Sequence, residues 1–375
     1  MGLRSQTRIL MLGAGITLSS GFLVSVLSGQ GYPILVGREV AAERVDAVTG
    51  GGHFPVMVRL DSGDLVAAVR GGATHVGVKG RLDWIRSMDS GKTWTRTTLV
   101  DTALDDRNPA VGQLRDGTVV VTYHVAGGYG PTGEPPPPGS AIIRDGLYVL
   151  RSTDRGLTWE KPIKSQIPLE LGASSYGKIV QLRDGTALMG VYYLKGVPYE
   201  HISYVYRSGD GGKTWGDPSK IADDFDETAL VVLPDDRIMA VLRSKNGAFL
   251  ASSFSADKGR TWSQPRQITA NREHPADLIL LKDGRLLLAY GERNRPYGVR
   301  ARISRNLGVS WEAETIVLVA DAETTDCGYP SSAEVSPGKI VTLYYGVNGA
   351  YDPYGKEPGS LSRAFTRAVL WSVPQ

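Results

Sequence analysis

The side chains of this chain that can do acid–base and nucleophilic chemistry recur at fixed distances from six Asp-Gly-type turns. About nine or ten residues before each turn glycine, the positions hold His53, Arg107 with Asn108, Tyr176, Glu227, His274 and Tyr329. About seven residues after each turn, they hold Arg70, His124, Tyr192, Arg243, Gly291 beside Glu292, and Tyr345. Titratable groups that converge on one place are typical of a small-molecule site.

The turns themselves predict the elements that position these side chains. Sequences of the form Leu-x-Asp-Gly, or close variants, occur between apolar runs at 60–63, 114–117, 182–185, 233–236, 281–284 and 335–338. Each predicts a β-hairpin. The start of the first strand and the end of the second lie together, away from the turn. We therefore expect the polar side chains to surround one mouth of a central axis.

A second repeat, Ser-x-Asp-x-Gly-x-x-Trp, lies between the hairpins. It occurs at 87–94, 152–159, 208–215 and 255–262, and at 304–311 with Asn306 in place of Asp. Asp or Asn can bond the backbone ahead of it, Gly adopts positive φ, and Trp packs the turn against the core. This octet predicts the turn between the third and fourth strands of a blade.

Six hairpins at this period predict an all-β fold, a six-bladed β-propeller of four-stranded antiparallel blades over residues 32–375. Only five octets accompany the six hairpins, and ring closure accounts for the difference. We expect residues 364–373 to supply the third strand of the last blade and residues 34–40 to supply its fourth. Closure by N- and C-terminal strands removes a free sheet edge.

The bulk composition excludes several other classes of protein. A net charge of +3 and the absence of a basic stripe do not favour a nucleic-acid partner. The single cysteine, Cys327, excludes an internal disulfide and a cysteine metal cage. No metal-ligand spacing and no phosphate-binding glycine loop is present, so we expect no metal and no cofactor, although a structural ion such as calcium stays open.

Residues 1–31 predict a signal peptide or an N-terminal anchor. Arg4 and Arg8 precede an apolar stretch at 9–27 and a small-residue exit at 28–31. The apolar stretch is long enough to cross a bilayer if it is not cleaved. We expect export to the periplasm or the medium, with membrane contact only through an uncleaved N-terminus.

The longest connection between a second and a third strand, 127–145, contains four consecutive prolines at 135–138. The hairpin geometry places it over the mouth. A lid or specificity wall and a stiff polyproline excursion both remain open for it.

The octets and the blade number resemble the sialidase superfamily with its Asp-box (BNR) repeats, over roughly residues 33–375. The segment from Glu227 to Arg243 is similar to one in which a glutamate precedes an arginine of the carboxylate-binding triad. Asp326-Cys-Gly-Tyr329-Pro is similar to the segment that presents the catalytic tyrosine. The resemblance implies that Tyr329 is the nucleophile and Glu227 its base. It also implies a further triad arginine, for which we favour Arg300 over Arg295 and Arg302.

Two family positions differ here. The family's Arg-Ile-Pro reads His53-Phe54-Pro55, and the loop at 71–81 lacks the acid/base aspartate. That loop offers His75, which we expect to act as general acid because imidazole titrates near neutrality, and Asp83 follows the loop. We expect Arg70 to replace the missing arginine in part. The expected substrate-binding set is Arg243, Arg300, Arg70, His53, Arg107, Tyr176 and His274.

These features favour an exo-acting, sialidase-like glycoside hydrolase that cleaves a terminal acidic sugar from a glycan with a Tyr/Glu nucleophile pair. A non-catalytic carbohydrate-binding propeller is the first alternative. A propeller polysaccharide lyase is the second, in which an arginine neutralises a uronate while His or Tyr removes the adjacent proton. The ultraviolet absorbance of an elimination product separates a lyase from a hydrolase.

Overall fold

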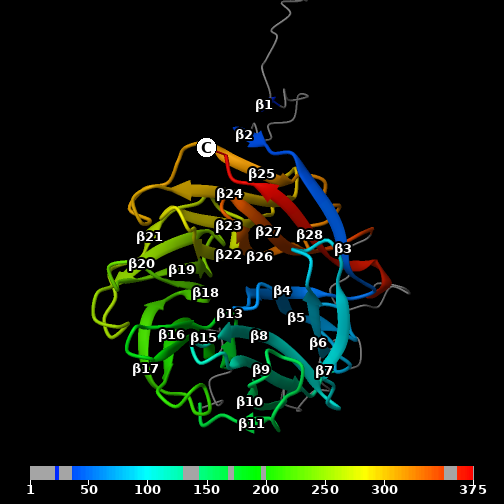
Figure 1. Cartoon of the computed structure of the whole chain (residues 1–375), viewed down its shortest axis with the longest axis vertical. Helices are drawn as coiled ribbons and strands as arrows, with labels where there is room; N and C mark the ends of the chain where they lie inside the picture. The colour runs from blue at the N-terminus through cyan, green and yellow to red at the C-terminus, as the bar shows by residue number, and fades with distance from the viewer. Residues whose placement is uncertain are drawn as a thin grey trace, which may run out of the picture.

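The computed structural model describes residues 22–24, 36–129, 143–167, 173–195, 200–349 and 361–374. Within these ranges the chain forms small antiparallel sheets around a central axis (Figure 1), and its one helical element is the 3-10 turn Leu361–Arg363. The expected six-bladed all-β propeller is confirmed.

The blades follow one another along the chain, each from an inner to an outer strand. Blade one is β4 (His53–Arg59), β5 (Leu65–Gly71), β6 (Arg81–Ser87) and β7 (Thr95–Val100). Blade two is β8 (Asp105–Gln113), β9 (Val119–Gly127), β10 (Ile143–Ser152) and β11 (Ile163–Lys164). Blade three has a broken inner strand and consists of β12 (Ser174–Ser175), β14 (Val180–Gln181), β15 (Ala187–Lys195), β16 (Glu200–Ser208) and β17 (Gly216–Asp223). Between β12 and β14, the short strand β13 (Gly177–Lys178) pairs in parallel with β8 of blade two.

Blades four and five complete the first five sheets. Blade four is β18 (Phe225–Val232), β19 (Ile238–Ser244), β20 (Leu250–Ser255) and β21 (Arg266–Gln267). Blade five is β22 (Glu273–Leu280), β23 (Leu286–Glu292), β24 (Gly298–Ser304) and β25 (Thr315–Val319), and its outer edge is extended by β2 (Val36–Glu39) and β1 (Phe22–Val24).

Blade six is joined from both ends of the described chain. It contains β26 (Cys327–Ser336), β27 (Lys339–Val347), β28 (Ala364–Ser372) and β3 (Ala42–Thr49). The third strand lies where we expect it, but the expectation that 34–40 is the fourth strand is wrong. Residues 42–49 pair with β28, and residues 36–39 run parallel to β25 on the neighbouring blade.

Local hydrogen bonds explain why both repeats form turns. In the first hairpin, the Leu60 amide donates to the Asp64 carbonyl at 2.8 Å, and the Gly63 amide donates to the Leu60 carbonyl at 2.9 Å. In the first octet, Asp89 Oδ1 accepts the Thr93 amide at 2.9 Å, and Trp94 Nε1 donates to the Gly91 carbonyl at 3.0 Å. These contacts lie within each repeat, so the sequence encodes them directly.

A β-bulge interrupts the inner strand in five of the blades. In each, two inner-strand residues face one residue of the next strand. The bulged pairs are Phe54-Pro55, Asn108-Pro109, Asp226-Glu227, His274-Pro275 and Tyr329-Pro330. Proline has no N–H to leave unpaired at the second position. Blade four alone among them has a carboxylate there, Glu227.

A buried ion pair crosses between blades near the axis. Figure 1 shows β13 close to the centre of the ring, where Lys178 Nζ lies 2.7 Å from Asp277 Oδ1 of β22 and 2.8 Å from the Ser332 carbonyl of β26. The Ser332 amide donates to Asp277 Oδ2 at 2.6 Å. This group therefore connects blades three, five and six.

The targeting segment expected at residues 1–31 lies largely outside the described residues. Its residues 22–24 form β1. In the part of the chain that the structure covers, no helix has the length and apolar character needed to span a bilayer.

We predict that Lys178→Met lowers the free energy of unfolding by about 3–5 kcal/mol, because it leaves Asp277 buried without its cation. Urea unfolding measures this loss, and the double variant Lys178→Met/Asp277→Asn should recover part of it. The exposed pair Lys220–Asp223 provides the control, since Lys220→Met should cost less than about 1 kcal/mol. Equal losses for the two single variants would contradict the role of the buried pair.

Candidate active site

Tyr329, Glu227 and Arg243 form one hydrogen-bonded group at the end of the ring away from the turns. Tyr329 Oη donates to Glu227 Oε1 at 2.6 Å. Arg243 Nη1 donates to Glu227 Oε2 at 2.8 Å and to Tyr329 Oη at 3.2 Å. Blades four and six thus place a phenol, a carboxylate and a guanidinium in direct contact, as the spacing from the turns predicts.

Burial sets the charge state of this group. Burial and the charge of Glu227 raise the pKa of Tyr329 well above its ordinary value, against the influence of Arg243. The phenol therefore stays protonated at neutral pH. Burial also raises the pKa of Glu227, which Arg243 opposes and the negative charge of Asp226 reinforces. Glu227 is thereby a stronger base than an ordinary carboxylate, which suits it to accept the Tyr329 proton.

The backbone around Tyr329 is held in an uncommon conformation. Tyr329 has φ of 47°, and it follows Gly328 at φ 101°. A Cβ at Gly328 would lie 2.8 Å from Gly291 Cα of blade five. Only glycine allows this approach between blades. A second contact joins blades five and six at the same place: the Arg293 guanidinium lies 5.7 Å from the centre of the Tyr329 ring.

Asp226 lies beside the group and has a histidine partner of its own. Asp226 Oδ1 accepts the Glu227 amide at 2.8 Å, and Asp226 Oδ2 lies 3.1 Å from His201 Nδ1 of β16. Burial would raise the pKa of Asp226, but Arg243 and His201 outweigh it and hold the pKa below its usual value. A second, ionised carboxylate therefore stands next to the base.

His75 is held at the same mouth by a buried carboxylate. His75 Nδ1 lies 2.9 Å from Asp326 Oδ1, which also accepts the Tyr345 hydroxyl at 2.6 Å. The His75 ring packs edge-on against Phe54 at 4.8 Å, and the Phe54 ring lies 4.9 Å from that of Tyr329. One quarter of the His75 side chain remains exposed. The pairing of Nδ1 leaves Nε2 available for proton transfer.

The histidine that replaces the family's first arginine carries no charge at neutral pH. His53 is 1% exposed, and burial lowers its pKa to about 3, partly opposed by Asp326. His274 is also buried, and burial lowers its pKa well below the ordinary range. Neither histidine can supply the positive charge that an arginine would bring to a substrate carboxylate.

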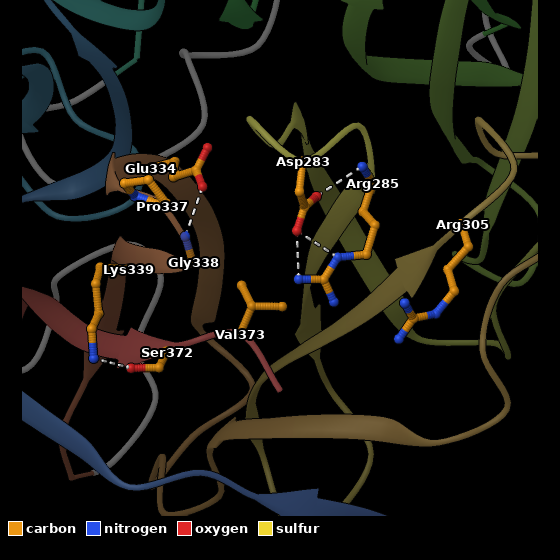
Figure 2. A pocket seen from close by; sticks show the side chains of 9 residues that line it. All are labelled: Asp283, Arg285, Arg305, Glu334, Pro337, Gly338, Lys339, Ser372 and Val373. Carbon is orange, nitrogen blue, oxygen red and sulfur yellow. Dashed lines mark hydrogen bonds and ion pairs between the residues drawn. The ribbon is translucent and has the colours of Figure 1, made fainter. Parts of the chain in front are cut away.

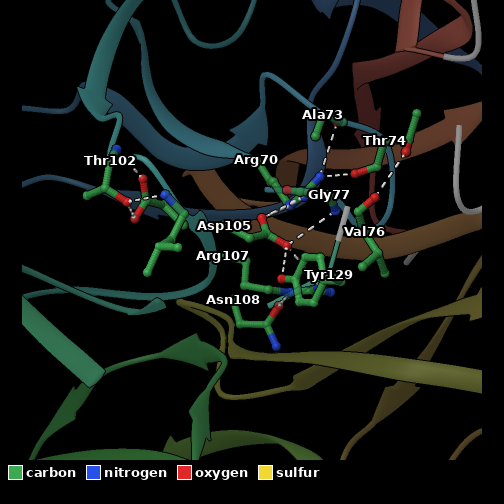
Figure 3. A network of polar contacts seen from close by, with 12 residues as sticks. Arg70, Ala73, Thr74, Val76, Gly77, Thr102, Asp105, Arg107, Asn108 and Tyr129 are labelled. Atoms are coloured by element: carbon green, nitrogen blue, oxygen red, sulfur yellow. Dashed lines mark hydrogen bonds and ion pairs between the residues drawn. The ribbon is translucent and has the colours of Figure 1, made fainter. Parts of the chain in front are cut away.

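The structure corrects the expectation for Arg70. Its side chain is fully buried, and every N–H of its guanidinium donates within the protein (Figure 3). The acceptors are Asp105 and the carbonyls of Ala73, Thr74 and Gly77. Arg70 therefore has no N–H left for a substrate.

Arg107 and Tyr176 lie at the mouth where the spacing predicts. Arg107 Nη1 lies 3.3 Å from Asp105 Oδ2, and its side chain is 15% exposed. The neighbouring Asn108 donates to Tyr192 Oη at 2.8 Å. The Tyr176 ring meets the Tyr329 ring edge-on at 5.2 Å. Arg107 is thus a partly exposed cation on the blade-two side of the mouth.

Arg300, the favoured further triad arginine, is fully buried. Its Nη atoms donate to the carbonyls of Val299, Val319 and Pro296, while its Nε has no hydrogen-bond partner among the described residues. Of the alternatives, Arg295 stacks on Tyr297 at 4.9 Å and Arg302 donates to the Ile268 and Glu312 carbonyls.

Arg293, Asp226 and Asp326 belong to the site but escape the sequence reasoning. Arg293 lies just beyond the end of β23, two residues after the counted position Gly291. Asp226 and Asp326 are buried carboxylates that no spacing rule distinguishes from surface ones. The adjacency of Asp226 to Glu227 and of Asp326 to the tyrosine segment was the available signal.

A half-buried glutamate, Glu273, and a buried one, Glu292, lie together at the blade-five side of this mouth. Glu273 and Glu292 face each other across β22 and β23. Burial raises the pKa of both carboxyls, and that of Glu292 reaches about 7. Glu292 Oε1 accepts the Asn294 amide at 2.8 Å.

The 127–145 connection, for which a lid or wall and a stiff polyproline excursion are both open, is described only at its ends, because residues 130–142 lie outside the described residues. Among the residues that are described, no three His, Cys, Asp or Glu side chains gather as a metal site would require.

A separate hollow of about 580 Å³ lies near the turns of blades five and six (Figure 2). Its charged groups have partners: Arg285 pairs with Asp283, and Arg305 pairs with Glu312. Lys339 Nζ donates to Ser372 Oγ at 2.8 Å. The hollow therefore lacks the free reactive groups that the opposite mouth presents.

Residues 105–341, more than half of the chain, match the BNR repeat-like domain family. The chain belongs to this family. It is a BNR-repeat member of the sialidase superfamily. A sialidase of Bacteroides fragilis is 25% identical over 216 residues, which cover 53% of this chain and 39% of that protein. The BNR-repeat chain thus spans well under half of its relative's length.

Solved structures share the BNR propeller. A protein of unknown function from Dyadobacter fermentans has a TM-score of 0.73 and 25% identity, with 88% of this chain and 98% of that one covered. A Hadza microbial sialidase has a TM-score of 0.66 and 19% identity, with coverage of 86% and 66%. A sialidase of Streptococcus pneumoniae has a TM-score of 0.62 and 15% identity, with coverage of 91% and 71%. At these last two identities the likeness shows the fold alone.

We predict that Glu292→Gln stabilises the protein at pH above about 7 by up to about 3 kcal/mol. The folded-state pKa of Glu292 lies above its unfolded value, so the protonated carboxyl contributes stability below the unfolded pKa. This contribution is lost as the pH rises through the folded pKa, because the buried carboxyl then ionises. Urea unfolding from pH 4 to 8 should show a gain that grows with pH. The exposed Glu43→Gln serves as control, and a gain independent of pH would contradict the assignment.

Proposed function

We propose that this chain is an exo-acting, retaining glycoside hydrolase that removes a terminal acidic sugar from a glycan. The observation that carries the proposal is the contact of 2.6 Å between Tyr329 Oη and Glu227 Oε1, with Arg243 bonded to both. Superfamily membership supports a sialidase-like hydrolase, while the roles of the catalytic residues and the identity of the sugar belong to the proposal.

The first step uses the phenol as nucleophile. Tyr329 Oη attacks the anomeric carbon while its proton passes to Glu227. The glycosidic bond breaks, and the leaving oxygen takes the proton of His75 Nε2. Burial would raise the pKa of Asp326, but His75 outweighs it and keeps that pKa well below its usual range, so an ionised carboxylate faces His75 Nδ1 at 2.9 Å.

The second step returns both protons. Water gives a proton to His75 Nε2 and attacks the anomeric carbon. Tyr329 leaves and takes its proton back from Glu227. Two displacements at one carbon retain its configuration. A neutral phenol, in contrast with a carboxylate nucleophile, does not repel the carboxylate of an acidic sugar.

Three arginines would bind the acidic group of that sugar. Arg243 already contacts the Tyr/Glu pair, Arg293 lies over the Tyr329 ring, and Arg107 is partly exposed on the opposite side. Guanidinium groups pair well with carboxylates. Arg107 would take the place of the family's missing first arginine, since His53 is neutral.

The neutral His53 also favours a second candidate, a propeller that binds an acidic glycan without cleaving it. In that case Glu227→Gln and Tyr329→Phe would leave binding intact, and the wild-type protein would release no sugar.

We predict that Tyr329→Phe and Glu227→Gln each reduce kcat/KM by about 10²-fold or more on a sialylated oligosaccharide, because each removes one partner of the nucleophile pair. Release of free sialic acid by the full-length protein measures this. Tyr344→Phe is the control, since Tyr344 is a buried tyrosine of the same blade that packs on Phe365. Full turnover by either site variant would exclude this mechanism.

We also predict that Asp226→Asn shifts the acidic limb of the kcat/KM profile to lower pH, because the charge of Asp226 helps to raise the pKa of Glu227. The rate at neutral pH should fall, since a weaker base removes the Tyr329 proton. Asp106→Asn, a buried aspartate bonded to Thr102, should leave the limb in place. A uniform loss at every pH would show that Asp226 has only a structural role.

A further inference from the structure

Arg70 is surrounded by the loop that carries His75. Its guanidinium Nη1 donates to the carbonyls of Ala73, at 3.1 Å, and of Thr74, while Nη2 donates to the Gly77 carbonyl at 3.2 Å (Figure 3). The bonded carbonyls thus stand on both sides of His75 in the chain. A single buried cation fixes the backbone before and after the candidate acid.

Asp105 of β8 balances the charge of Arg70. Its side chain is fully buried, and Oδ1 accepts Arg70 Nη2 at 2.6 Å and Nε at 3.1 Å. Burial would raise the pKa of Asp105, but Arg70 and Arg107 outweigh it and hold the pKa below its usual range. Oδ2 accepts the Tyr129 hydroxyl at 2.6 Å. The pair therefore ties the blade-one loop to blade two.

The space around this pair is filled. A Cβ at Gly80 would press on Asp105 Oδ1 and lie 2.5 Å from Arg70 Nη2. The loop can close on the ion pair only with glycine at this position. Gly80→Ala therefore perturbs the pair without altering either charged residue.

We propose that Arg70, through its buried pair with Asp105, is the positioning residue that sets His75 for proton transfer. The inference rests on the proposed role of His75 in the hydrolase reaction. A general acid acts only when its N–H reaches the leaving oxygen, and misplacement by about 1 Å can cost about 10²-fold in rate. Arg70 itself contacts neither substrate nor reacting atoms, because all of its N–H groups are occupied.

The leaving group distinguishes this role from a merely structural one. The leaving group of a 4-nitrophenyl sialoside, 4-nitrophenolate, departs without protonation. The lactose that leaves sialyllactose needs a proton on its leaving oxygen. His75→Ala should lose about 10²-fold on sialyllactose and far less on the nitrophenyl substrate. Arg70→Lys and Gly80→Ala should show the same selective loss, by about 10-fold or more on sialyllactose.

Two comparisons make the test specific. Arg207→Lys is the matched control, because Arg207 is a buried arginine whose Nη atoms donate to the Asp217 and Lys258 carbonyls, beside the octet turns on the other face. It should keep the wild-type ratio of the two rates. The double variant Arg70→Lys/His75→Ala should be no slower on sialyllactose than His75→Ala alone. Equal losses on both substrates, or additive losses in the double variant, would overturn the proposal.

A readout without turnover separates this inference from the proposed function. Nitrogen-15 NMR of the His75 ring reports whether Nδ1 stays bonded to Asp326. We expect Arg70→Lys and Gly80→Ala to change the His75 signals and Arg207→Lys to leave them in place. If the wild-type protein cleaves no sialoside, the hydrolase proposal fails. Unchanged His75 signals in both loop variants would refute the positioning role in either case.

Discussion

Inner strands from six blades converge on one axis, and a polar group that reaches this axis loses its water and must find a partner within the protein. Lys178–Asp277 and Arg70–Asp105 are two ion pairs that satisfy this constraint. The first links non-consecutive blades, and the second links blade one to blade two. The β-bulges near the mouth satisfy it in another way, because proline at the second bulged position leaves no N–H unpaired. Glu227, the exception, donates its N–H to Asp226 Oδ1.

The same burial decides which residues can react. It keeps His53 and His274 neutral and Tyr329 protonated, so none of the three is charged at neutral pH. It also strengthens Glu227 as a base. His75 differs from the buried histidines because part of its side chain is exposed and its Nδ1 lies 2.9 Å from Asp326 Oδ1. The reactive groups of the mouth are therefore distinguished by their surroundings more than by their residue types.

An arginine near the mouth is a ligand for an acidic sugar only where it has an N–H to spare. Arg70 has the same sequence spacing from its turn as Arg243, yet all of its N–H groups donate to backbone carbonyls or to Asp105. Arg300 is fully buried, and its Nη atoms donate to backbone carbonyls of its own blade. In the proposed hydrolase the cationic surroundings of the substrate then come from Arg107, Arg243 and Arg293. Blade one thus contains both His53 at the position of the family's first arginine and Arg70 bonded within the His75 loop.

The sequence by itself determined the ring, because the contacts of each hairpin turn and each octet lie within a few residues and repeat with the blades. The same spacing brought Tyr329, Glu227 and Arg243 to one mouth. Tertiary structure alone decided the rest. Residues 42–49 close the last blade although half of them are polar and most are exposed, so no continuous apolar run marks them. Arg293 joins the site from just beyond a strand end, where counting from the turn no longer applies. Whether Arg70 meets a substrate or a ring of carbonyls depends on the path of the loop around it, which the residue types of that loop do not encode.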